Sequence, residues 1–197
     1  MGKQTIPECI NRVEICGTIV HKFKTDNWTS ITVSIPTDSE ITNYPKVYWF
    51  DDMAAEVDAN YNVGGRVEIV GQLRTSQTLR DSAIAGESIS PTIGWFDAKF
   101  NPTEEFKPSR NEVLLKGEFV RAHTPNPGIS IITIKVTDGE HEYYPQVACF
   151  GRLVAKAVEL AEGEVICIVA RIQTQRKETK KGTKYFQRIA CREMRAT

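Results

Sequence analysis

The chain has 197 residues, of which 41% are hydrophobic and 25% are charged. This composition excludes a largely disordered chain, and the longest strongly apolar run, 165–170, is far shorter than the roughly 20 residues of a membrane-spanning helix. The zero net charge is a cancellation, because residues 1–105 have 9 Lys and Arg against 15 Asp and Glu, whereas residues 106–197 have 16 against 10. The basic half predicts an anionic partner.

The first half of the chain predicts short strands around one helix. Strands are expected at 12–20, 30–35 and 46–50, where apolar and β-branched residues gather. A helix is expected at 52–60, because the carboxylates of Asp51 and Asp52 favour a helix N-terminus. Strands are expected again at 66–73 and within 89–100.

The second half predicts the same order of elements. Strands are expected at 113–120, 129–136 and 143–150, with a loop at 123–128 and a turn at Asp138-Gly139. Apolar residues then recur at helical spacing from Leu153 to Ala161, before Gly163. Strands at 165–174 and 185–191 flank a charged turn at 176–182. Three strands, a helix and two strands predict an all-β five-stranded Greek-key barrel, the OB-fold.

The two halves also resemble each other in sequence. A shift of 100 residues aligns 11–50 with 111–150, and thirteen of the forty positions are identical, against about one in sixteen by chance. The identities include Asn11/Asn111 and Gly17/Gly117. We therefore predict two tandem OB-fold domains, at 1–100 and 111–197. The proline-containing segment 101–110 is predicted to be an exposed linker.

An ordered series of motifs in the second half resembles a known family. It comprises Asn111-x-Val-x-Leu-x-Gly117, Tyr144-x-x-Val-x-x-Phe-Gly-Arg-Leu153, Ala157-x-x-Leu-x-x-Gly163 and a basic hairpin before Tyr185-Phe186. In this order the residues resemble the bacterial and phage single-stranded-DNA-binding proteins. The first half matches more loosely, through Asn11-x-Val-x-Ile-x-Gly17 and Gly71-Gln-Leu-Arg-Thr75.

The resemblance implies sequence-nonspecific binding of single-stranded DNA in replication, recombination or repair. It also implies a homodimer that presents four OB-folds. Family members usually end in a tail with an acidic tip, whereas this chain ends in Arg192-Glu-Met-Arg-Ala-Thr197. The family aromatic after the fourth strand is replaced by Gln175-Arg-Lys177. Diverged members without the tail occur on phages and mobile elements, which we take as the expected origin.

Single strands offer phosphates and base faces, so a nonspecific binder needs cations along a groove and aromatic rings on its floor. The predicted cations of the second half are Arg121, Lys135, Arg176, Lys177, Lys180, Lys181, Lys184 and Arg188. Its predicted aromatic contacts are Tyr144, Phe150, Tyr185 and Phe186. Phe150 could equally fill the barrel, and only one of the adjacent Tyr185 and Phe186 can face the ligand. The first half offers Trp28, Tyr44, Arg74 and Arg80.

No enzyme, metal site or cofactor is predicted. The three histidines are isolated, and no phosphate-binding glycine loop or nucleophile motif is present. The five cysteines lack Cys-x-x-Cys spacing, which favours buried thiols and, with no apolar leader in the first ten residues, a cytoplasmic protein. Two alternatives stay open: an OB-fold scaffold in a replication or conjugation complex, and an RNA-binding protein.

Overall fold

The computed structural model describes residues 9–37, 41–75, 92–100, 108–139, 141–179 and 182–197. The side chains of 92–100, 138 and 175–185 lie outside that description. Within it, β-strands dominate and two short helices accompany them. No described helix is both long enough and apolar enough to cross a membrane.

The strands of the first half close into a ring. In chain order the elements are β1 (Ile10–Lys24), β2 (Trp28–Pro36), β3 (Thr42–Asn43), β4 (Lys46–Phe50), α1 (Asp51–Asn60), β5 (Arg66–Arg74) and β6 (Thr92–Phe100). β1 pairs with β2, β2 with β4, β4 with β6, β6 with β5, and β5 with β1. The largest fully buried side chain of this ring, Trp49, lies in the core with alternate residues of β5.

The second half repeats this closure. Its elements are β7 (Arg110–Asn126), β8 (Ile129–Asp138), β9 (His141–Tyr143), β10 (Gln146–Phe150), α3 (Arg152–Glu159), β11 (Val165–Thr179) and β12 (Gly182–Ala196). The ring runs β7, β8, β10, β12, β11 and back to β7. The five-stranded barrel and the helix after the third long strand follow the predicted order.

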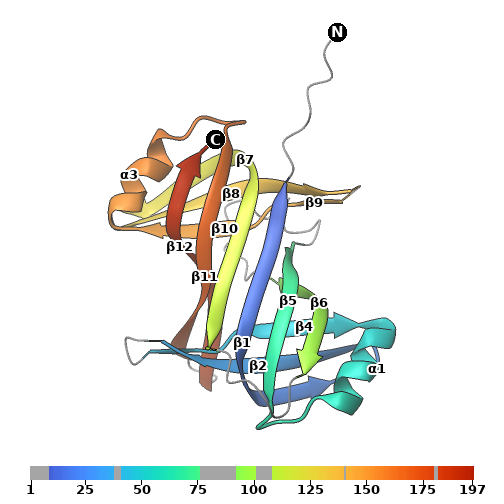
Figure 1. Ribbon diagram of the computed structural model, residues 1–197. Coiled ribbons are helices and arrows are strands. Elements are labelled where there is room, and N and C mark those ends of the chain that lie inside the picture. The colour runs from blue at the N-terminus through green and yellow to red at the C-terminus, as the bar shows by residue number, and fades with distance from the viewer. Residues whose placement is uncertain (1–8, 38–40, 76–91, 101–107, 140, 180–181) are drawn as a thin grey trace.

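The two rings share one continuous sheet, because β1 pairs antiparallel with β7 (Figure 1). Val13 lies opposite Val113, so the ladder is centred on positions related by the 100-residue shift. The basic β11–β12 hairpin reaches from the second ring alongside the first (Figure 1). There, Thr174 on β11 accepts a hydrogen bond from the Tyr44 backbone N–H at 2.9 Å.

The shared asparagine joins strands within each ring. The Asn11 amide donates to the Leu73 carbonyl at 2.8 Å and accepts from the Leu73 N–H at 2.9 Å. Asn111 forms the same pair with Ile172, at 2.7 and 2.8 Å. A buried amide that meets both backbone groups satisfies polar atoms that would otherwise be costly to bury.

The shared glycine allows two strands to cross closely. A Cβ atom on Gly17 would overlap the backbone oxygen of Ser34, and one on Gly117 would overlap that of Lys135. Only glycine leaves room for this approach. The repeated motif therefore has a structural role in each ring.

Two predicted boundaries were wrong. The predicted loop 123–128 belongs largely to β7, because His123 and Asn126 pair with Ile131 and Ile129 across a register shift that absorbs Pro125. The predicted charged turn 176–182 is mostly strand, since the β11–β12 ladder continues to the pair Thr179 and Gly182. Of the predicted linker, residues 101–107 lie outside the described residues, and Arg110 is the first residue of β7.

Candidate nucleic-acid interface

An arginine and a phenylalanine stack on the outer face of the second ring. The Arg188 guanidinium carbon lies 4.8 Å from the centre of the Phe150 ring. The Arg188 Nε donates a hydrogen bond of 2.9 Å to the side-chain oxygen of Gln173, which fixes the guanidinium plane. Burial lowers the pKa of Arg188, but an arginine side chain stays cationic at neutral pH. The stack offers both a positive charge and a flat face.

Two further arginines extend this surface. Arg171 lies opposite Ala190, and Gln173 lies opposite Arg188, in the β11–β12 ladder. Because alternate strand residues share a face, Arg188 and Arg192 flank Ala190 on one side of β12. All of these side chains, together with Phe150 and Cys191, line an open pocket of about 460 Å³. We call Phe150, Arg171, Gln173, Arg188 and Arg192 the arginine surface.

The arginine surface continues to the junction of the two rings. Arg171 and Arg192 also line a second cavity, of about 530 Å³, with Thr37 of the first ring, Ser109 just before β7, and Arg110 of β7. Arg110 is partly compensated, because it forms an ion pair with Glu14 across the β1–β7 ladder. The Glu14 carboxylate also accepts a hydrogen bond from Arg12 at 2.7 Å.

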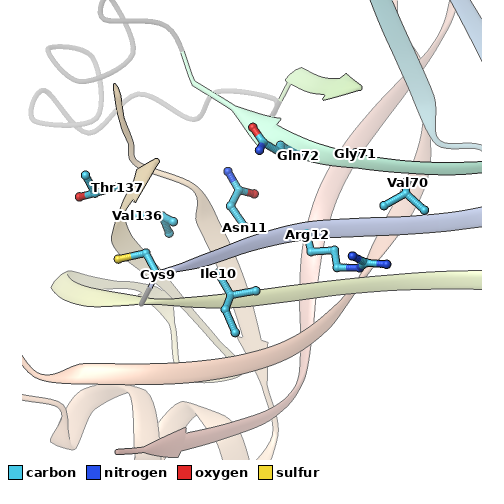
Figure 2. Close-up of a pocket in the computed structure, with 9 residues that line it drawn as sticks. All are labelled: Cys9, Ile10, Asn11, Arg12, Val70, Gly71, Gln72, Val136 and Thr137. Carbon is cyan, nitrogen blue, oxygen red and sulfur yellow. The ribbon is translucent and has the colours of Figure 1, made fainter. Parts of the chain in front are cut away.

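The corresponding cavity on the other side of the junction is smaller and less cationic (Figure 2). It has a volume of about 290 Å³, and Figure 2 shows residues from the start of β1, the end of β5 and the end of β8 around it. Cys9, Ile10 and Gln72 take the places of Ser109, Arg110 and Arg171. Three arginines and Glu112 line the larger cavity, whereas Arg12 is the one charged residue that lines the smaller one.

Tyr144 lies at the opposite end of β10 from Phe150, within a polar group. Its hydroxyl donates to the Glu142 carboxylate at 2.7 Å, and its backbone N–H donates to the Thr75 hydroxyl at 2.8 Å. Lys135 forms a 2.7 Å ion pair with the same Glu142, and that hydrogen bond raises the pKa of Lys135. The charge of Lys135, which the sequence predicted to contact phosphate, is thus partly neutralised by Glu142.

The first ring carries an exposed aromatic cluster. The ring centre of Trp28 lies 5.4 Å from that of Phe23 and 5.4 Å from that of Tyr48. The Lys46 ammonium lies over Trp28 at 5.7 Å and over Tyr48 at 5.0 Å. Phe23 is 48% exposed, so an apolar face meets solvent beside a cation. The Lys46 backbone N–H donates to Gln187 of β12 at 3.1 Å, which places this cluster beside the second ring's hairpin.

The structure places the predicted site residues unevenly. It brings Phe150 and Arg188 together, and Phe150 is half-buried under the guanidinium instead of filling the barrel. Phe186 and Tyr44 are exposed, while Trp28, Arg74, Arg121 and Tyr144 are half-buried. The remaining predicted residues lie outside the described residues entirely (Arg80, Lys180, Lys181) or with their side chains (Arg176, Lys177, Lys184, Tyr185).

Sequence reasoning missed three residues of the arginine surface: Arg171, Gln173 and Arg192. The signal was present, since Arg188 and Arg192 are four residues apart on one strand and Arg171 and Gln173 are two apart on its neighbour. The pairing register that brings these four residues together depends on contacts between strands, so the local sequence of either strand does not predict it.

The described residues contain no candidate metal site. Within the ranges that the structure describes, no group of three or more His, Cys, Asp or Glu side chains could hold a metal ion. All five cysteines are described and are free thiols, of which Cys16, Cys149 and Cys191 are buried and Cys9 and Cys167 are half-buried.

Comparison with solved structures identifies the fold. The wild-type single-stranded DNA binding protein from Thermus aquaticus superposes with a TM-score of 0.65 at 14% sequence identity, covering 96% of this chain and 94% of that one. The chain has the fold of that protein. A deletion mutant of the same protein gives a TM-score of 0.63 at 16% identity, covering 98% and 96%. No protein-family model and no curated protein sequence matches the chain.

Proposed function

We propose that this protein binds single-stranded DNA without sequence preference and protects it during replication, recombination or repair. The observation that carries the proposal is the arginine surface. Phosphates would meet Arg171 and Arg192, and bases would stack at the Phe150–Arg188 pair. The fold shared with the Thermus aquaticus protein supports the proposal.

The proposed path starts at β10 and runs toward the junction of the rings. The pocket at Phe150 shares Arg171 and Arg192 with the cavity that Ser109 and Thr37 line. A strand on this path would leave the second ring beside the first. The aromatic cluster of Phe23, Trp28 and Tyr48 then offers further stacking faces next to Lys46. This cluster would let the net acidic first half contribute by stacking.

We further propose that the two rings are tandem OB-fold domains derived by duplication, at 1–100 and 111–197. Supporting this are the paired asparagines, the paired glycines and the β1–β7 ladder centred on Val13 and Val113. Two chains would form a homodimer presenting four OB-folds, and the origin would be a phage or mobile element. Light scattering coupled to size-exclusion chromatography tests the dimer, since a monomer's mass would contradict it.

The experiment for the function is fluorescence anisotropy with a labelled oligo-dT of about 35 nucleotides, longer than the roughly 8–32 that two OB-folds occlude. Titrations at two salt concentrations use duplex DNA as a competitor. We expect tight, salt-sensitive binding that duplex DNA does not displace, because binding releases condensed cations. Absence of binding at low salt would overturn the proposal and favour the protein-interaction scaffold.

A second arm separates DNA from RNA. Stacking faces and arginines serve both polymers, whereas a protein tells them apart only through groups that meet the 2′-hydroxyl. Unlabelled oligo-dT and oligo-U of equal length therefore compete against the same labelled probe. Stronger competition by oligo-dT agrees with the proposal, and stronger competition by oligo-U would assign the surface to RNA.

A further inference from the structure

Two thiols lie next to each other in the second ring, on strands far apart in sequence. The parallel β10–β12 ladder pairs Val147 with Ile189 and Ala148 with Ala190, so the next position on each strand is Cys149 and Cys191. Facing residues on neighbouring strands have Cα atoms about 4.8 Å apart, within the span that a disulfide bridges. The strand geometry alone therefore suits a bond between these cysteines.

The two sulfur atoms also interact. A hydrogen bond from the Cys191 thiol holds the pKa of Cys149 below its ordinary value, although burial acts in the opposite direction. The same hydrogen bond, together with burial, raises the pKa of Cys191. When Cys149 is protonated, the Glu193 carbonyl oxygen, 3.4 Å from the Cys191 sulfur, provides another acceptor. Of the two thiols, Cys149 is therefore the one that loses its proton at the lower pH.

A small molecule can approach this pair. Cys149 is fully buried, but Cys191 lines the pocket of about 460 Å³ on the arginine surface. The pair lies just past the last residue pair of the β10–β12 ladder. This ladder has only two residue pairs, so few backbone hydrogen bonds hold the two strands together there. In the first ring the 100-residue shift replaces Cys149 by Trp49, so the thiol pair belongs to the second ring alone.

We propose that Cys149 and Cys191 are an oxidation site, at which hydrogen peroxide converts the two thiols into a disulfide that joins β10 to β12. The Cys149 thiolate attacks one peroxide oxygen, the O–O bond breaks, and the departing hydroxide takes a proton to become water. The Cys191 sulfur attacks the resulting sulfenic sulfur, the S–O bond breaks, and hydroxide leaves with the Cys191 proton as a second water. Both sulfurs are oxidised and the peroxide is reduced to two waters.

Peptide mapping tests the site, because cleavage after Lys and Arg puts each of the five cysteines in a separate peptide. The folded, reduced chain is treated with hydrogen peroxide, its remaining thiols are alkylated, and it is digested without reductant. We expect peptides 136–152 and 189–192 to be linked, with a mass lower by two hydrogen atoms than their sum. The urea midpoint of the treated protein should rise, and a reductant should reverse both changes.

Two variants complete the test. Cys167→Ser removes a half-buried thiol of β11 and should leave the linked peptide unchanged, whereas Cys149→Ser should abolish it. If Cys149→Ser fails to fold, the wild-type map decides the question alone. Recovery of Cys149 and Cys191 as alkylated thiols, at a peroxide dose that oxidises Cys9, would overturn the proposal. Linkage of either residue to another cysteine would overturn it equally. DNA binding does not enter the readout, so the result is independent of the proposed function.

Discussion

At the scale of single residues, the stack of Arg188 on Phe150 can contribute to binding in two ways, through its positive charge and through its flat face. Gln173 holds the guanidinium plane through a single hydrogen bond, so the flat face of Arg188 is preset before any ligand arrives. A lysine ammonium carries the same charge, but it is not planar and does not hold its N–H donors in a fixed arrangement as a guanidinium does. The two contributions can therefore be measured apart.

Arg188→Lys should weaken oligo-dT binding while the salt dependence stays unchanged. The expected loss is about 1 kcal/mol, at the lower end of the stacking contribution of one base. Arg188→Gln should lose affinity and also reduce the salt slope, because the charge is gone. Anisotropy titrations over a series of salt concentrations give both quantities. Equal affinities for wild type and Arg188→Lys would exclude stacking at this residue.

The crossing glycines give a residue-scale test of the fold. Gly117→Ala should lower the free energy of unfolding by roughly 1–3 kcal/mol, since the new methyl group meets the Lys135 carbonyl, which cannot move without its strand. Gly128→Ala is the matched control, because its Cβ would lie at an ordinary 3.5 Å from the Asn126 side-chain oxygen. Urea denaturation measures both variants. Similar midpoints for the two would contradict the close crossing of β7 and β8.

At the scale of elements, the β1–β7 ladder joins the rings, and its ion pairs respond to pH. Hydrogen bonding from Arg12 is the main reason that the pKa of Glu14 lies below its ordinary 4.5, with the Arg110 charge adding to it. A lowered folded-state pKa means that the carboxylate's contribution to stability is complete above about pH 4.5. The contribution is lost as the pH falls through the lowered value.

Glu14→Gln should therefore cost about 1 kcal/mol of unfolding free energy at pH 7 and progressively less as the pH falls below the ordinary carboxyl pKa. Arg195→Gln is a suitable control, since its ion pair with Glu193 lies on β12, which β7 and β11 separate from β1. Urea midpoints at several pH values measure the difference. A cost for Glu14→Gln that is independent of pH would show that the Glu14 ion pairs contribute nothing to stability.

Local sequence was a good guide wherever one strand or helix could be judged alone. Alternation over 129–136 predicted β8, and the apolar spacing after Phe150 predicted α3. It failed at 123–128 and 176–182. In both segments, pairing with the neighbouring strand continues through residues that favour turns, so they lie in strands. The same contrast holds for the candidate site. Phe150 and Arg188 were predicted, while Arg171 and Arg192 join them only through the β11–β12 register.

At the scale of the whole molecule, similar folds carry different surfaces. The cavity beside Arg171 and Arg192 is cationic, and its counterpart beside Cys9 and Gln72 has Arg12 as its one arginine. The first ring carries an aromatic cluster, whereas the second carries the arginine surface and the basic hairpin. A single strand that follows both would meet arginines and one stacking face on the second ring and further stacking faces beside Lys46 on the first.

The most direct test of this account is the salt slope of oligo-dT binding for Arg171→Gln/Arg192→Gln, compared with wild type and Arg195→Gln. If both arginines meet phosphates, the slope of log affinity against log salt should shrink by roughly 1.4, at about 0.7 per contact on a single strand. Arg195→Gln, whose side chain is 79% exposed outside the arginine surface, should leave the slope close to wild type. A double variant with the wild-type slope would contradict the account and move the phosphate path elsewhere.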